Sequence, residues 1–461
     1  MSNLALNIAA SALDASQAGM DVVSQDLANV NTPGYVREQT DMSAVPGGVT
    51  QVGDGVTVTG VSQISSTLAQ ASANAANGVT AQWSALTQIL SNAQTLFPEP
   101  SGGGIQSQLT SFWNAWDGIA NDPTALAPRQ ELVSTAQEVV GSISQTYQSL
   151  VSDQNQTVSE LQATVAEVNR TLAQVASLNQ SISTTGAAGG DINSLTDQMN
   201  QFVSTLANDI GATAQTQPGG TVTIRLGGIT LVQGTQQMDT LSVSTTGGAT
   251  TLAAQVNSAV TGGPVPVTSG TVAGQIAGLA RLGSYEASMN SVASALATTV
   301  NSQLAAGGYW NSAGTLVTPG PPLFVNTATG TTAGVNASNI EVSSTIASNP
   351  MEIAASSATA TGSNDGSNAQ ILAQDFNIAG GPDQTYQGFI AQLGADVQSA
   401  TNELTAKQAS SQAADNANLQ ISGVNPNEES VQMVAYQNAF QAATKVVTAV
   451  QTMMQSLLSA V

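Results

Sequence analysis

Residues Leu13–Gln39 read LDASQAGMDVVSQDLANVNTPGYVREQ, a helical pattern followed by a turn signal. Apolar positions recur here at alternating spacings of three and four, which is the heptad pattern of a helix that packs along one face. The helix is expected to end at Thr32-Pro33-Gly34-Tyr35, because proline disfavours helical geometry in the preceding residue and Pro-Gly favours a type II turn. The predicted seam, extended upstream, consists of Leu6, Ala9, Leu13, Ser16, Met20, Val23, Leu27 and Val30.

A second heptad seam occupies the C-terminal segment. Its start is marked by Asn425 as N-cap, Pro426 at the first helical position and Glu428 where a capping-box carboxylate belongs. Amphipathic helices commonly pack inside one bundle, but these two lie at the ends and are separated from the rest by turns. We therefore expect them to pair as an α-helical coiled coil and to mediate self-assembly, since such a pair alone is marginal in water. The seam consists of Met433, Tyr436, Phe440, Ala443, Val447, Val450, Met454, Leu457 and Val461.

Between the two seams, helical and β-rich patterns alternate. Helical periodicity covers residues 79–97, 105–119, 129–182, 191–210, 273–305, 369–376 and 386–404, whereas 212–269 contains short β-rich runs separated by glycine pairs. The sequence predicts a mainly α, elongated multidomain protein with outer β-rich segments. Four parts are expected: a terminal coiled-coil assembly domain of residues 1–36 with 424–461; a helical-bundle domain of 37–211 with 271–306 and 368–423; a β-rich insertion at 212–270; and a β-rich or loop-rich insertion at 307–367.

Charge is unusually scarce in this chain. Only 8% of residues are charged, the net charge is −22, and the seven basic residues are isolated along the sequence. Without a basic patch, nucleic acid and anionic membrane surfaces are poor partners. The N-terminus has no basic segment followed by an apolar run, so no cleaved signal peptide is expected. No apolar run approaches the roughly 20 residues of a transmembrane helix.

Catalytic and metal-binding chemistry finds little support in the residue inventory. The chain has no histidine and no cysteine, which excludes a Ser-His-Asp triad and thiolate sites. A Ser-Lys dyad would need Lys407 or Lys445, and both lie on predicted helices without a surrounding motif. The acidic pair Glu428-Glu429 is better explained by a helix start that favours negative charge. We predict no catalytic, cofactor-binding or metal-binding residue and no cofactor.

Both ends resemble the axial flagellar family of rod, hook and hook-associated proteins. The N-terminal family motif is carried by Ala28, Asn29, Asn31, Thr32, Pro33, Gly34 and Tyr35. The C-terminal partner motif is carried by Gly423, Val424, Asn425, Glu428 and Glu429, followed by the YQxAxQA pattern from Tyr436. Pro426, Asn427 and Phe440 depart from the usual family residues. The NTPGY form and the stretch Phe112–Gln137 are closer to the hook-associated branch than to the hook protein.

The resemblance implies a structural subunit of the hook–filament junction that self-assembles as a ring on the distal end of the hook. Implied partners are the hook protein, the second junction protein (hook-associated protein 3) and an export chaperone at the C-terminal helix. The implied location is the extracellular flagellum, reached through type III export. The alternatives are a hook or distal rod subunit, a secreted adhesive or surface-layer protein, and an enzymatic domain inserted in a flagellar scaffold.

Overall fold

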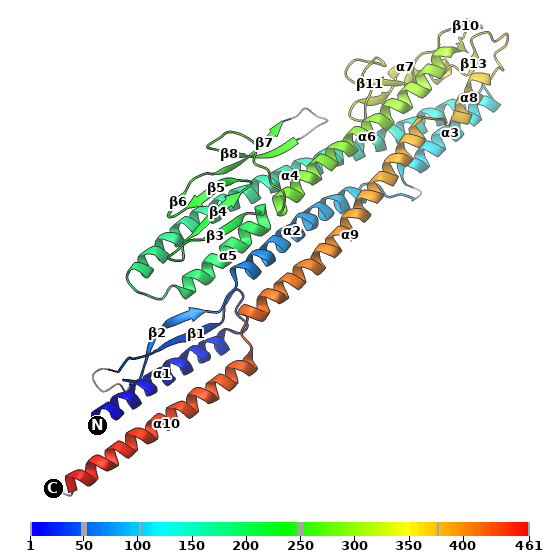
Figure 1. The fold of residues 1–461 in the computed structure, drawn as a ribbon. Helices are drawn as coiled ribbons and strands as arrows, with labels where there is room; N and C mark the ends of the chain where they lie inside the picture. The colour runs from blue at the N-terminus through cyan, green and yellow to red at the C-terminus, as the bar shows by residue number, and fades with distance from the viewer. Residues whose placement is uncertain (1, 48–52, 101–102, 247–252, 376–377, 460–461) are drawn as a thin grey trace.

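A computed structural model describes residues 2–47, 53–100, 103–246, 253–375 and 378–459. The molecule is elongated, with a bundle of long helices at one end and the two terminal helices at the other (Figure 1). The predicted mainly α fold with β-rich insertions is confirmed. The helices are α1 (Ser2–Asn29), α2 (Thr67–Thr95), α3 (Ile105–Asn121), α4 (Leu126–Ala187), α5 (Asn193–Ile210), α6 (Thr271–Ala306), α7 (Ser344–Ser348), the 3-10 turn η1 (Pro350–Glu352), α8 (Ser367–Gln374), α9 (Pro382–Ser422) and α10 (Pro426–Ser459).

The bundle contains two apolar cores along its length. The distal core lies at the end of the bundle far from the chain termini (Figure 1). It joins α2, α3, α8 and α9 to the first half of α4 and the second half of α6 around Phe112, Trp113 and Trp116. The other core joins α5, the second half of α4 and the first turns of α6 to a small sheet around Ile224 and Val232. Because α4 and α6 run through both cores, they hold the two halves of the bundle together.

The strands form small antiparallel sheets beside the helices. A four-stranded sheet in the order β3-β4-β5-β6 and the hairpin β7-β8 cover α4 and α5, and the remaining sheets lie at the far end of the bundle or beside α1. The strands are β1 (Glu38–Ala44), β2 (Val56–Gln63), β3 (Thr213–Thr216), β4 (Val222–Leu226), β5 (Ile229–Gln233), β6 (Gln236–Gln237), β7 (Leu241–Thr246), β8 (Ala253–Ser258), β9 (Gly307–Trp310), β10 (Leu316–Val317), β11 (Phe324–Asn326), β12 (Ile340–Val342) and β13 (Ser356–Ser357).

Two features differ from the sequence expectation. Helices α2 and α9 are longer than their apolar periodicity indicated, because polar pairs connect them where apolar residues are sparse. The Asn77 amide donates to Asp415 at 2.9 Å, and the Asn418 amide donates to Gln70 at 2.9 Å. The hairpin β1-β2 was not predicted, because residues 37–211 were assigned as a whole to the helical domain. It packs against α1 (Figure 1).

Candidate assembly site at the chain termini

Helices α1 and α10 lie side by side and run in opposite directions (Figure 1). Buried or half-buried positions on α10 recur at spacings of three and four. All of those that follow Glu429 in the chain belong to the predicted seam. Beyond them, Met454 and Leu457 are exposed; Val461 lies outside the described residues. The covered positions are Met433, Tyr436, Phe440, Ala443, Val447 and Val450.

The predicted seam of α1 is covered less evenly. Val23 is buried and Leu13, Met20 and Leu27 are half-buried, whereas Leu6 and Val30 are exposed. Three buried residues that the predicted seam did not include complete this face, namely Ala15, Gly19 and Val22. This face is wider than one seam because α1 also contacts the β1-β2 hairpin.

At Gly19, helix α1 lies directly against the ring of Tyr436 on α10. A Cβ atom at this position would lie 2.5 Å from the ring of Tyr436, so only glycine fits beneath that ring. The sequence analysis placed Tyr436 in the seam but did not identify its partner, since glycine carries no hydrophobic signal.

The turn after α1 has the predicted geometry. Helix α1 ends at Asn29, the Tyr35 amide donates to the Thr32 carbonyl at 3.2 Å, and Gly34 has a φ of 79°. A positive φ at the third residue is what a type II turn requires. Gln201 of α5 donates to the Pro33 carbonyl at 3.1 Å, which ties this turn to the bundle.

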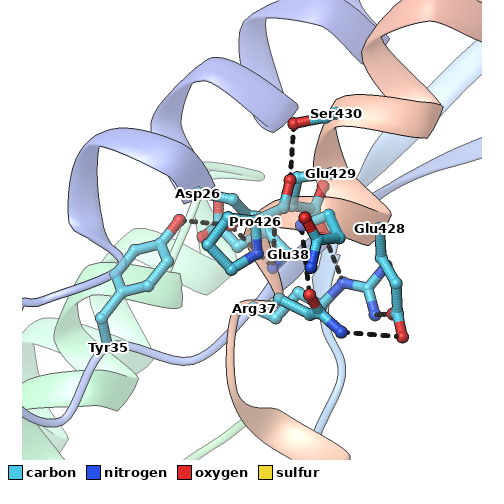
Figure 2. Close-up of polar contacts among 10 residues, drawn as sticks. Asp26, Tyr35, Arg37, Glu38, Pro426, Glu428, Glu429 and Ser430 are labelled. Carbon is cyan, nitrogen blue, oxygen red and sulfur yellow. Dashed lines mark hydrogen bonds and ion pairs between the residues drawn. The ribbon is translucent and has the colours of Figure 1, made fainter.

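A buried carboxylate holds the turn against the end of α1. Asp26 accepts a hydrogen bond of 2.7 Å from the Tyr35 hydroxyl and further bonds of 3.1 and 3.3 Å from the Glu38 backbone N–H (Figure 2). Burial raises the pKa of Asp26, and these hydrogen bonds oppose that rise. Burial and the neighbouring Asp26 carboxylate raise the pKa of Tyr35. Tyr35 therefore acts as a neutral donor.

Arg37 connects the outgoing chain to the returning chain (Figure 2). Its Nη1 lies 3.0 Å from Glu428 Oε2, and its Nε lies 2.6 Å from Glu429 Oε1. The Arg37 backbone N–H also donates to the Ser422 carbonyl at 2.9 Å. Glu429 is only 1% exposed, so burial raises its pKa while the guanidinium of Arg37 opposes the rise. One cation thus fixes the start of α10 against the segment that leaves α1.

The start of α10 is capped largely as predicted. The Asn427 N–H donates to Asn425 Oδ1 at 3.1 Å, and Pro426 is the first helical residue. Glu428 accepts from the Asn425 side-chain amide at 3.2 Å rather than from the backbone. Gly423 allows the chain to turn here, since a Cβ would lie 2.5 Å from the Leu419 carbonyl oxygen; Val424 is half-buried beside it.

Of the family-motif residues, the structure brings Tyr35, Glu428 and Glu429 into this junction. Ala28, Asn31, Thr32, Pro33 and Gly34 are exposed. Sequence reasoning missed Asp26, Arg37 and Glu38. Arg37 was recognised only as an isolated cation. In a chain with seven basic residues, an arginine two positions after Tyr35 could have been matched to the Glu428-Glu429 pair.

The carboxylates of this junction are engaged by Arg37, Tyr35 or backbone N–H groups. Over the described ranges, no group of three or more His, Cys, Asp or Glu side chains could hold a metal ion. Across the same part of the chain, no helix is both long enough and apolar enough to span a membrane.

Two known protein families match the two ends of the chain, where α1 and α10 lie. The family described as flagella basal body rod protein matches residues 6–35, and the C-terminal domain of the flagellar basal body rod FlgEFG proteins matches residues 416–460. An elongated helical chain whose ends pair in this way, and carry these matches, is a subunit of the flagellar axial class. The family described as the helical domain of flagellar hook-associated protein FlgK matches residues 90–324, just over half of the chain. The chain belongs to the flagellar hook-associated protein FlgK family.

Individual relatives support the same family. Flagellar hook-associated protein 1 of Escherichia coli (strain K12) is 28% identical over 245 residues, which is 51% of this chain and 44% of that protein. The Salmonella typhimurium protein of the same name is also 28% identical over 245 residues, 43% of its length. The match thus spans less than half of these curated relatives. The flagellar hook junction protein FlgK from Burkholderia pseudomallei shares the fold, with a TM-score of 0.62 at 16% identity over 75% of this chain and 98% of that one.

Proposed function

We propose that the chain is a structural subunit of the hook–filament junction and that it self-assembles on the distal end of the hook. The observation that carries this proposal is the incomplete covering of α10. One face packs on α1, while other apolar side chains of the same helix are open to solvent. A run of exposed apolar side chains marks an interaction surface. The exposed residues are Val431, Val434, Val446, Met453, Met454, Leu457 and Leu458.

The proposal includes specific partners and a location. Copies of the chain form a ring through the paired terminal helices, with the hook protein below and hook-associated protein 3 above. An export chaperone binds α10 before assembly, because its apolar side chains need covering until other copies arrive. The location is the extracellular flagellum, reached by type III export, and the chain has no enzymatic activity.

The first alternative is a hook or distal rod subunit, since matches at both ends come from rod-protein families. Such a subunit would form a long polymer or an internal rod rather than a junction. The matched helical domain at residues 90–324 favours the junction, because it belongs to the hook-associated branch.

The test is a strain lacking this gene, studied by electron microscopy and by analysis of the culture supernatant. The junction role predicts complete hooks without filaments and flagellin lost to the medium. A plasmid copy of the full chain should restore filaments. Absence of the hook would instead support the rod or hook alternative, and normal filaments would refute the flagellar junction role.

A further inference from the structure

A groove in the helical bundle runs between α2 and α4, and the first half of α6 forms its floor. Helix α6 packs against both α2 and α4, whereas these two helices barely contact each other. The groove holds a cavity of about 280 Å³. Across the described residues, no lysine or arginine lines this cavity. Its lining includes Ala85 and Ile89 of α2, Asp153 and Glu160 of α4, and Gln275 of α6.

The side chain of Gln275 is an unpaired acceptor on the floor of the groove. Only 6% of this residue is exposed, and its Oε1 has no hydrogen-bond donor among the residues that the structure describes. A buried acceptor without a donor destabilises the folded chain, and nearly all such oxygens in proteins are paired. The Gln275 oxygen therefore indicates that a hydrogen-bond donor enters the groove from solvent.

Two carboxylates of α4 line the same cavity. Asp153 is half-buried; burial raises its pKa, and no hydrogen bond opposes that rise. Glu160 accepts a hydrogen bond from the Gln156 amide at 2.9 Å. Neither carboxylate belongs to an ion pair within the described ranges. Carboxylate and amide oxygens only accept hydrogen bonds, so the groove is complementary to an ammonium group, which only donates them.

The hydrogen bonds of Ala337 show how α4 and α6 are aligned. The Ser144 hydroxyl donates to the Ala337 carbonyl, and the Ala337 N–H donates to Asn290 Oδ1, each at 3.0 Å. Ser144 of α4 is therefore level with Asn290 of α6, and the two helices run in opposite directions (Figure 1). Glu160, sixteen residues further along α4, is then level with the start of α6 beside Gln275. These two acceptors form one end of the groove.

Asp153 forms the other end of the groove. It lies seven residues before Glu160, which is ~10 Å along α4 at ~1.5 Å per residue. The wall between the two ends is apolar, because Ile89 of α2 lies there against Gly278 of α6. A Cβ added at Gly278 would be 2.5 Å from Ile89 Cδ1. Two acidic ends separated by an apolar wall match a ligand with an ammonium at each end and methylene groups between them.

We propose that this groove binds a linear aliphatic diamine. One ammonium donates to Glu160 and to Gln275 Oε1, the other donates to Asp153, and the methylene chain lies against Ile89. Because the ligand binds only the folded bundle, it also stabilises the bundle by mass action. The site lies outside the terminal helices, so the inference does not depend on the proposed assembly role.

Isothermal titration calorimetry of the full chain at constant ionic strength tests the site, with octamethylenediamine as the probe. Saturable binding is expected. Trimethylenediamine and n-butylamine should bind at least about tenfold more weakly, because neither can place an ammonium at both ends of the groove. Equal affinity for octamethylenediamine and trimethylenediamine, or no binding of either, would overturn the proposal.

Magnesium chloride controls for the general attraction of a dication to a chain with a net charge of −22. It should show no saturable binding and should not compete with octamethylenediamine at constant ionic strength. Saturable magnesium binding that displaces the diamine would identify a metal site and overturn the diamine site.

Substitutions test the two ends of the groove separately. Asp153→Asn and Glu160→Gln should each weaken diamine binding about tenfold, because each removes a hydrogen bond to a charged acceptor. Glu138→Gln removes an exposed carboxylate of α4 outside the groove and should leave the affinity unchanged. An equal loss in all three variants would mean that net charge alone attracts the diamine, and the site would be wrong.

Gln275→Met keeps the approximate shape of the side chain and removes its acceptor. It should weaken diamine binding about fivefold, since one hydrogen bond from the ammonium is lost. Circular dichroism of the ligand-free variant shows whether the bundle is folded; if it is not, the two carboxylate variants decide. Unchanged affinity in a folded Gln275→Met chain would show that this oxygen faces no ligand and would overturn the proposed site.

Discussion

The helical bundle and the terminal pair are built from the same kind of helix but differ in how completely they are covered. In the distal bundle core, Phe112, Trp116 and Leu132 have no exposed surface at all. In α10, by contrast, the described residues include only three buried ones, Glu429, Ala443 and Val450. The bundle completes its core within one chain, and the terminal pair does not. The fold therefore separates a part whose core is closed within one chain from a part that leaves apolar side chains exposed.

This separation predicts that the two regions respond independently to mutation. Val450→Asp is expected to have the largest effect. It places a charge at a position that is 5% exposed, and it should abolish assembly on hooks. The melting temperature of the bundle, followed by circular dichroism of the purified chain, should not change.

The matched control is Thr448→Asp, two residues earlier on the same helix. Thr448 is exposed and does not belong to the predicted seam, so this variant should assemble normally. Filaments in the Val450→Asp strain would show that the seam does not mediate assembly. A large drop in the melting temperature would show that the terminal pair and the bundle form one cooperative unit.

The sequence was sufficient for the long helices because their apolar periodicity is strong. It also placed Met433, Tyr436 and Phe440 on one face of α10, where the structure covers them. The domain boundaries and the role of the seams in assembly remain predictions. The later turns of α9 were missed because amides such as Asn418 hold them, and amides do not contribute to an apolar seam.

The junction was only half visible in the sequence for a different reason. Thr32 to Tyr35 and Asn425 act through local backbone geometry, which short motifs specify. Arg37 and Asp26 act through partners that folding brings close: Glu428 is 391 positions from Arg37 in the chain. Charge alone did not distinguish Arg37 from the other isolated basic residues, because pairing depends on the fold.

Removal of Arg37 is expected to weaken the terminal pair by about 3 kcal/mol, because it leaves a buried carboxylate without its partner. Arg37→Gln should increase hydrogen exchange in α10 and at the end of α1, while exchange in α3 and α4 stays the same. The pKa of Glu429 should rise further, since the guanidinium that opposes the effect of burial is gone. Adding Glu429→Gln should recover part of the lost protection.

Arg170→Gln is the control for this prediction. Arg170 pairs with Glu167 on the surface of α4, where both side chains are largely exposed. Such a pair contributes less than about 0.5 kcal/mol, so exchange should be unchanged. Equal effects of the two arginine substitutions would contradict a structural role of the junction.

Helix α6 of the bundle carries a buried carboxylate that accepts no hydrogen bond from the described residues. Glu286 on α6 is fully buried, neither of its oxygens has a hydrogen-bond partner among the described residues, and burial raises its pKa to about 7. Between the ordinary pKa near 4.5 and about 7, the folded chain retains a proton that the unfolded chain releases. The free energy of unfolding therefore falls as pH rises through this window and is lowest above it.

Glu286→Gln should remove this pH-dependent loss of stability. Relative to wild type, the variant should gain about 2–3 kcal/mol of stability between pH 5 and pH 8. Denaturant unfolding at both pH values measures the difference and cancels the contributions of other acidic groups. Glu341→Gln, at an exposed position, should show no such gain. A pH-independent difference for Glu286→Gln would mean that this carboxyl does not titrate in the window.

The smallest effect should arise at the turn that separates the two regions. Gly34 has a φ of 79°, and an added side chain would be strained there whatever the space available. Gly34→Ala should therefore destabilise the terminal pair by about 1 kcal/mol. Gly388→Ala in α9 is the matched change with the opposite sign: a Cβ there meets nothing within 4 Å, and alanine favours the helix by up to about 1 kcal/mol. Hydrogen exchange should thus rise in α1 and α10 for the first variant and fall in α9 for the second. If both changes shifted both regions together, the turn would transmit stability instead of separating the bundle from the assembly helices.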